Sequence, residues 1–235
     1  MFNKKLISLN NNQLKIIALI SMVIDHAGLV LFPRAAIFRI LGRLSFPIYA
    51  YMIAEGCAHT KNRKKHLGII LGMGLIFQIV WFLFSRSLYH NILLTFSLSI
   101  GMIYAIDGLI KNKNRCYRIL MILAIIFIVF VGVVCPILFS YYGFDFDYSV
   151  WGIVLPILIY FAPTKATKLE YTTILLCAMA CFSNITQWFA LLSIPLLALY
   201  NGKMGKHNLK YLFYIVYPLH LIIIYGILIL LYIIR

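Results

Sequence analysis

The chain has 235 residues, of which 63% are hydrophobic and 11% are charged, and its mean hydropathy is +0.96. Soluble domains are about 25% charged and much less apolar, so this composition excludes a soluble enzyme or a soluble binding module. The net charge of +15 would indicate nucleic-acid binding in a soluble chain, but here it has to be interpreted for a membrane protein.

Eight long apolar runs follow one another, most of them near the ~20 residues that cross a bilayer core. They cover residues 14–32, 44–58, 67–84, 92–110, 117–139, 148–162, 171–199 and 211–234. These runs predict an all-α, polytopic transmembrane helical bundle of about eight or nine helices, ten at most, with some short or broken helices around a central polar cavity. Without internal repeats or low-complexity tracts, we expect one integral membrane domain over residues 1–235.

Lysine and arginine gather in short clusters between the apolar runs, as the positive-inside rule describes. These clusters lie at residues 4–5, 61–66, 111–118, 163–168 and 202–210. The loop 141–149 instead carries two aspartates and no cation. We therefore expect a cytoplasmic N-terminus, an outer loop at 141–149, and no nucleic-acid partner. The first run has no convincing cleavage site and is expected to remain as a helix.

The run 171–199 is too long for one simple crossing, and the polar letters SNITQ interrupt it at residues 183–187. Two short or broken helices would return the basic segment 202–210 to the cytoplasm. Nine crossings are therefore favoured, with eight as the alternative. The five cysteines form no CxxC pair and no metal spacing with histidine, so we expect no metal.

The first run contains Asp25 and His26 near its centre, where ionisable groups are costly. Lys15 precedes His26 by eleven residues, which places both on nearly the same helix face and about 16 Å apart along the axis. A cation at the membrane rim and an imidazole near the midplane suit an elongated anionic ligand. The alternative is a buried, hydrogen-bonded Asp25–His26 pair that only fixes helix packing.

The segment 38–56 begins with Arg39 and Arg43, four residues apart on one face, and ends with Glu55. Guanidinium groups bind phosphate or carboxylate by paired hydrogen bonds. The alternative is an arginine pair at the outer interface, neutralised by Glu55. Pro47 is expected to weaken or kink this helix.

Two later segments carry further polar candidates. Asn91 and Thr95 share a face, where they serve either as site groups or as interhelical hydrogen-bonding groups. Pro218 and His220 give the last helix an irregular, polar beginning, and His220 is either a site residue or a structural histidine.

Together these segments resemble the TraX-type membrane acetyltransferase family, which is named after a protein that acetylates pilin at its N-terminus. The resemblance rests on LKIIALISMVIDHAG (14–28), RILGRLSFPIYAYMIAEG (39–56), HTKNRKKH (59–66), NILLTFSLSIG (91–101) and YLFYIVYPLHL (211–221). TraX-type proteins in turn look related to the acyltransferase-3 class, whose first helix carries Arg or Lys, ten residues and then His. Lys15 and His26 match that spacing, although Lys keeps the charge without the planar fork of Arg.

The resemblance implies an integral membrane O- or N-acetyltransferase in the plasma (inner) membrane of a bacterium, with acetyl-CoA as the acyl donor. It implies His26 as the general base, with Asp25 or Glu55 orienting it. It implies Lys15 as a contact of the acyl-CoA, with Arg39, Arg43, Asn91 and His220 as further binding groups. Three acceptors stay open, namely a glycan, a peptide amine and a lipid headgroup. Whether the protein forms a homodimer in the lipid bilayer also stays open.

The alternative function is a small transporter or flippase for an anionic or lipid-linked solute, because proton-coupled carriers also use buried acids and histidines. Against this interpretation, the sequence has no inverted repeat. If the protein were only a helix-packing scaffold, the costly placement of Asp25, His26 and Glu55 in spanning runs would have no explanation.

Overall fold

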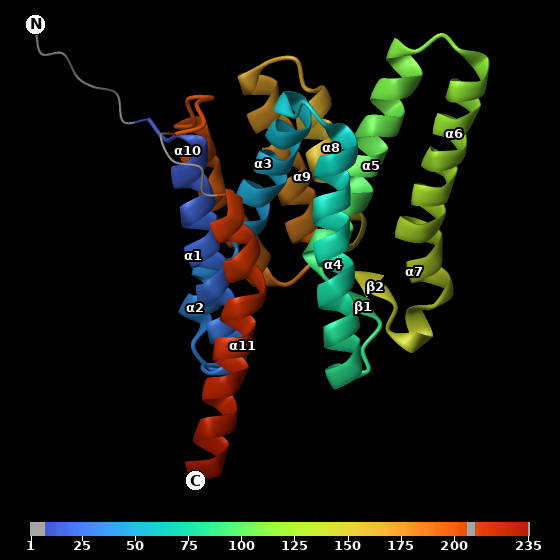
Figure 1. Cartoon of the computed structure of the whole chain (residues 1–235). Helices are drawn as coiled ribbons and strands as arrows, with labels where there is room; N and C mark the ends of the chain where they lie inside the picture. Colours follow the sequence, from blue (N-terminus) through green and yellow to red (C-terminus); the bar gives the residue numbers. More distant parts are fainter. Residues whose placement is uncertain (1–7, 206–209, 235) are drawn as a thin grey trace, which may run out of the picture. The chain divides into compact units, whose positions relative to one another are not determined.

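The computed structural model describes residues 8–205 and 210–234, and these residues are mostly helical (Figure 1). The α-helices are α1 (Asn11–Val30), α2 (Ala36–Gly42), α3 (Ser45–His59), α4 (Arg63–Ser85), α5 (Ile92–Lys111), α6 (Arg115–Val129), α7 (Cys135–Leu138), α8 (Ser149–Phe161), α9 (Lys165–Cys181), α10 (Ser193–Ala198) and α11 (Lys210–Ile234). Three other helical turns are the π-helical η1 (Phe130–Val134) and the 3₁₀-helical η2 (Ser140–Tyr142) and η3 (Ile185–Leu192). The basic cluster at 4–5 and part of the cluster at 202–210 lie outside the described residues.

Six described segments are long and apolar enough to cross a membrane. They are Asn11–Val30, Ala36–His59, Arg63–Ser85, Ile92–Lys111, Arg115–Leu138 and Ile215–Ile233. Two shorter apolar segments are Ser149–Phe161 and Ile185–Ala198. The all-α, polytopic membrane architecture is thus confirmed, whereas the count of eight or nine crossings is not. The 13 residues of α8 extend only about 20 Å, less than the ~30 Å bilayer core.

The long run 171–199 is divided, as the SNITQ interruption predicts. Helix α9 ends at Cys181, and η3 begins at Ile185 after Asn184, whose backbone is extended. The central polar cavity stays a prediction.

The chain forms two compact units. Unit 1 comprises Met1–Met52 and Thr172–Arg235, and unit 2 comprises Ile53–Tyr171. The expectation of one domain over residues 1–235 stays a prediction.

In unit 1, α1 packs against both α2 and α11 (Figure 1). Asn10 begins α1 with a capping box, because its side chain accepts from the Gln13 N–H and the Gln13 side chain accepts from the Asn10 N–H. Close packing of α1 on α2 depends on glycine. A Cβ atom at Gly28 would lie 2.3 Å from Phe38 Cβ, and one at Gly42 would lie 2.1 Å from Asp25 Oδ1.

The second spanning segment is interrupted between α2 and α3. Pro47 has no N–H to donate to the carbonyl of Arg43, and its ring clashes with that carbonyl in a continuous helix. The helix therefore stops at Gly42 and begins again at Ser45, whose hydroxyl donates to the Gly42 carbonyl at 2.9 Å. The interruption of the helix that Pro47 predicts thus lies one turn before the proline.

In unit 2, α5 packs against α4, α6 and α8. Its apolar core contains Cys57, Ile70, Ile100 and Ile103, all at most 5% exposed. Two short parallel strands, β1 (Tyr89–His90) and β2 (Asp145–Phe146), pair Tyr89 with Asp145 and join loops at one end of this unit.

Replacing Gly28 by alanine is expected to destabilise unit 1, because the new methyl group would overlap Phe38. Overpacking of this kind costs about 1–3 kcal/mol. The melting temperature of the detergent-purified protein should fall. The control is Gly226→Ala on α11, where an added Cβ meets no atom within 4 Å, so alanine should leave the melting temperature unchanged or raise it. Equal losses in both variants would refute the close-approach argument.

Candidate functional site

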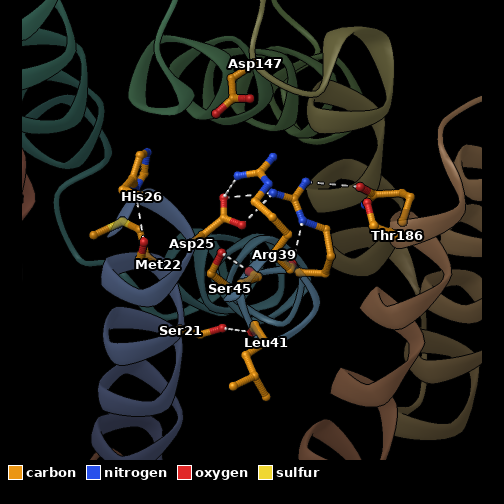
Figure 2. Close-up of polar contacts among 12 residues, drawn as sticks. Ser21, Met22, Asp25, His26, Arg39, Leu41, Ser45, Asp147 and Thr186 are labelled. Atoms are coloured by element: carbon orange, nitrogen blue, oxygen red, sulfur yellow. Dashed lines mark hydrogen bonds and ion pairs between the residues drawn. The ribbon is translucent and has the colours of Figure 1, made fainter. Parts of the chain in front are cut away.

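The carboxylate of Asp25 lies between two guanidinium groups (Figure 2). It accepts a hydrogen bond from Arg39 Nη1 at 2.8 Å, and its two oxygens lie 2.7 and 2.8 Å from Arg43 Nη2. The two arginines can reach one carboxylate because residues four apart share a helix face. The sequence therefore placed both arginines on the correct face. Both arginines pair with Asp25, whereas Glu55 pairs with Lys168 in unit 2, and neutralisation of the arginines by Glu55 stays an alternative from the sequence.

Gln187 completes this arrangement, and we call Asp25, Arg39, Arg43 and Gln187 the Asp25 cluster. Gln187 lies in η3 and accepts from Arg43 Nη1 at 3.3 Å. Sequence reasoning missed this residue. The only signal was that it ends the polar SNITQ interruption inside an apolar run.

The side chains of the Asp25 cluster are shielded to different degrees. Asp25 and Arg43 are 13% and 10% exposed, whereas Arg39 is 31% exposed. A buried charge is tolerated where it is paired and hydrogen-bonded, which explains how an acid can lie in a spanning helix. With two guanidinium groups and one carboxylate, the cluster carries a net charge of +1.

His26 makes a pair with His220 that the sequence could not predict. His26 Nδ1 lies 2.9 Å from the Met22 carbonyl oxygen and 3.3 Å from His220 Nε2. The ring centroids are 5.0 Å apart. His220 is 4% exposed, and its Nδ1 lies 2.9 Å from the Val216 carbonyl oxygen.

These contacts determine where the protons of the neutral imidazoles lie. A carbonyl oxygen only accepts, so Nδ1 is the donor in both rings. His220 Nε2 therefore carries a lone pair and accepts from the same His26 N–H that points to Met22. His26 Nε2 also carries a lone pair, and within residues 8–205 and 210–234 it has no hydrogen-bond partner.

Asp25 does not orient His26, which corrects that prediction. Neighbouring residues point about 100° apart on a helix, and Figure 2 shows His26 on a different side of α1 from the guanidinium groups. The Met22 carbonyl and His220 hold the imidazole instead. Lys15 lies on the same helix, eleven residues before His26 as expected.

Glu55 belongs to unit 2 and has its own partners there. Lys168 Nζ donates to its carboxylate at 2.5 Å, and His59 Nδ1 lies 3.9 Å from it. Asp107, the other acid in a spanning segment of this unit, pairs with Arg63 and Lys111 at 2.5 and 2.9 Å. A catalytic role of Glu55 stays a prediction, and its described contacts are those of an ion pair.

Asn91 caps α5. Its side-chain oxygen accepts from the N–H groups of Leu93 and Leu94, and its amide donates to Gly74 O at 2.9 Å and Gln78 Oε1 at 3.0 Å. All donors and acceptors of this amide are occupied, so the interhelical alternative describes it better than a ligand contact. Thr95 likewise donates to the backbone carbonyl of Asp147.

Side-chain hydrogen bonds of His90 and Tyr89 reinforce the pairing of β1 and β2 in unit 2. Burial lowers the pKa of His90, whose Nδ1 donates to the Asp145 carbonyl at 3.2 Å. Burial and the nearby Asp147 carboxylate raise the pKa of Tyr89, whose hydroxyl donates to that carboxylate at 3.1 Å. These contacts hold together the loops that carry β1 and β2. Because its pKa is lowered, His90 is uncharged at neutral pH. Among the described residues, no group of three or more His, Cys, Asp or Glu side chains could hold a metal.

The fold and the site define a multi-span helical membrane protein whose first helix carries an ion-paired aspartate and a histidine that pairs with His220 of α11. Residues 10–228 match the family described as TraX protein, and the chain belongs to this family. The relation to the acyltransferase-3 class stays a prediction.

Two relatives are similar over most of the chain. A protein named "Probable fimbrial assembly protein FimC, serogroup H1" from Dichelobacter nodosus is 26% identical over 89% of this chain and 91% of its own length. An uncharacterized protein from Rickettsia prowazekii (strain Madrid E) is 31% identical over 78% of this chain and 66% of its own length. No solved structure matches the chain significantly.

Replacing Asp25 by asparagine should strongly destabilise unit 1, because it leaves two guanidinium groups without their shared anion. Removing one partner of a buried ion pair costs about 3–5 kcal/mol. The measurement is denaturant unfolding of the detergent-purified protein. Glu170→Gln removes an exposed acid and serves as the control, with an expected change within about 0.5 kcal/mol. An Asp25→Asn variant as stable as this control would refute the role of the ion pair.

Proposed function

We propose that this protein is an integral membrane acyltransferase that moves an acetyl group from acetyl-CoA to a hydroxyl or amine acceptor. The observation that carries the proposal is the state of His26. Its Nδ1–H is held by the Met22 carbonyl and by His220, which leaves the lone pair of Nε2 without a partner among the described residues. An imidazole held in this way inside a spanning helix is suited to general-base catalysis.

Acetyl-CoA is an elongated anion, and Lys15 and His26 are arranged for such a ligand. They lie on one helix, nearly on one face, about 16 Å apart. In this proposal Lys15 contacts an anionic part of the donor, and the thioester lies near His26. With the proposed cytoplasmic N-terminus in a bacterial plasma membrane, the donor enters from the cytoplasm.

The reaction follows from these positions. His26 Nε2 takes the proton of the acceptor hydroxyl or amine, and the acceptor oxygen or nitrogen attacks the thioester carbonyl. The new C–O or C–N bond forms as the C–S bond breaks. The thiolate of CoA leaves and takes the proton from His26, which restores the neutral base. No metal is required for this sequence of steps.

The acceptor class follows less directly. The name of the Dichelobacter relative assigns that protein to fimbrial assembly. A peptide amine is therefore one acceptor to test, beside a glycan hydroxyl and a lipid headgroup.

Replacing His26 by alanine should lower acetyl transfer about 10²–10⁴-fold without weakening acetyl-CoA binding, because the base is lost and the donor contact at Lys15 is kept. Lys15→Ala should instead weaken acetyl-CoA binding about tenfold or more, the usual effect of losing a hydrogen bond to a charged group. Binding is measured by titration calorimetry on the detergent-purified full chain. Transfer is followed chromatographically as free CoA and acetylated product, with a short peptide, N-acetylglucosamine and phosphatidylethanolamine as test acceptors.

The matched controls are Lys64→Ala and His59→Ala, which remove an exposed lysine and an exposed histidine of unit 2. Both should keep binding and transfer. A His26→Ala variant with full transfer would show that His26 is not the base. If the unmodified chain binds neither acetyl-CoA nor CoA, the acyltransferase proposal fails, and CoA-independent uptake of an anionic solute by vesicles becomes the next measurement.

A further inference from the structure

His220 lies on α11 and directs one ring nitrogen at His26. It is 4% exposed, and its Nδ1 donates to the Val216 carbonyl of its own helix at 2.9 Å. Its Nε2 therefore carries a lone pair, and this nitrogen lies 3.3 Å from His26 Nδ1. The two rings are tilted by 57°, so they meet through their nitrogen atoms and are not stacked. A buried acceptor is thus fixed beside the donor nitrogen of the proposed base.

This acceptor contributes little while His26 is neutral. The Met22 carbonyl already accepts from His26 Nδ1–H at 2.9 Å, which is the shorter of the two contacts. The balance changes once His26 Nε2 takes a proton. The ring is then a cation, and a hydrogen bond from a charged donor is about twice as strong as one from a neutral donor. The contact with His220 therefore gains strength when the imidazolium forms.

The carboxylate nearest in sequence does not take this position. Asp25 is paired with Arg39 and Arg43, and among the described residues no carboxylate forms an ion pair with His26. In the acid–histidine pairs of hydrolases, a buried carboxylate accepts from the imidazole and stabilises its charged form. In this chain, the nitrogen of His220 and the carbonyl of Met22 are the acceptors at the corresponding position.

We infer that His220 is a positioning residue of the proposed acetyl transfer, because it accepts the Nδ1–H hydrogen bond of the His26 imidazolium. The inference rests on that proposed function. The proton of the attacking hydroxyl or amine moves to His26 Nε2 as the new bond to the acetyl carbon forms and the C–S bond breaks, and it then passes to the thiolate of CoA. His220 keeps its own Nδ1 proton throughout and gains none.

This role predicts where a loss of His220 is felt. An interaction that strengthens only as the charge forms raises kcat and leaves the binding of acetyl-CoA unchanged. The contact with acyl-CoA that the family resemblance implies for His220 predicts the opposite, a weaker affinity with kcat retained.

Two substitutions of similar polarity test the acceptor. The amide of glutamine ends about where Nε2 of histidine lies, whereas the amide of asparagine ends about where Nδ1 lies. His220→Gln therefore keeps an acceptor oxygen within reach of His26, and His220→Asn does not. The control is Ile224→Val, one turn further along α11, where a buried side chain loses one methyl group without a change at either histidine. It reproduces a loss of packing alone.

The full chain is purified in detergent, and transfer is measured at saturating acetyl-CoA with whichever test acceptor the unmodified chain uses. His220→Asn should lower kcat about 10–100-fold, the effect of losing a hydrogen bond to a charged group. His220→Gln should lose no more than about threefold, since an amide oxygen accepts in the same place. Ile224→Val should keep kcat although it unfolds at a lower temperature. The Kd of acetyl-CoA, measured by calorimetry, should be unchanged in all three variants.

A second measurement needs neither acetyl-CoA nor an acceptor. The six histidines are labelled with ¹⁵N in their rings, and the signals of His220 are those that disappear in His220→Gln. Nitrogen chemical shifts distinguish a ring nitrogen that carries a proton from one that carries a lone pair. In the unmodified chain at neutral pH, Nδ1 of His220 should carry the proton and Nε2 the lone pair.

The outcomes separate this inference from the proposed function. With transfer present in the unmodified chain, a normal kcat in His220→Asn overturns the role of His220 and leaves the acetyl transfer standing. A weaker affinity for acetyl-CoA with kcat retained overturns it equally, in favour of a binding contact. A proton on Nε2 of His220 overturns it even if His220→Asn does not fold. If the unmodified chain transfers no acetyl group, the proposed function fails and the role of His220 fails with it.

Discussion

The arrangement of α1 and α2 depends on one carboxylate that has to be neutralised inside a spanning helix. An ionised aspartate in apolar surroundings is tolerated only with hydrogen-bonded counter-charges, and Asp25 obtains them from Arg39 of α2 and from Arg43, the residue that follows α2. The second helix must therefore lie close to the first. Gly42 permits this approach, since any side chain there would overlap the atoms of Asp25. Asp25 thus determines both the placement of Arg39 and Arg43 and the close packing of α2 against α1.

The break after α2 is the second requirement of the same arrangement. In a continuous helix, the carbonyl of Arg43 would have to accept a hydrogen bond from the N–H of residue 47, which is a proline without an N–H. Because the helix stops at Gly42, α2 is only seven residues long and can pack against α1 independently of the direction of α3. The hydroxyl of Ser45 satisfies the Gly42 carbonyl at the break. Pro47 therefore favours the ion pair of Asp25 with the arginines through the helix break that it causes.

Sequence reasoning predicted what local periodicity determines. The apolar runs predicted the helices, the spacing of Lys15 and His26 placed them on one helix, and the SNITQ letters predicted the division of the long run. It failed where contacts join distant residues. His26 meets His220 across 194 positions, and Arg43 meets Gln187 across 144 positions. No helical period relates such residues. The cap formed by Asn91 was also missed, because a polar residue before an apolar run suits a cap and a ligand site equally.

The order of Asp25 and His26 separates the charged groups from the imidazole. Since consecutive residues on a helix diverge by about 100°, the acid faces the arginines while the imidazole faces α11. The imidazole of His26 is oriented by the Met22 carbonyl, which any helical residue four positions earlier would provide, and by His220. Its tautomer therefore does not depend on an acidic partner. The ion pair with the arginines and the lone pair of His26 Nε2 therefore lie on different faces of the same helix.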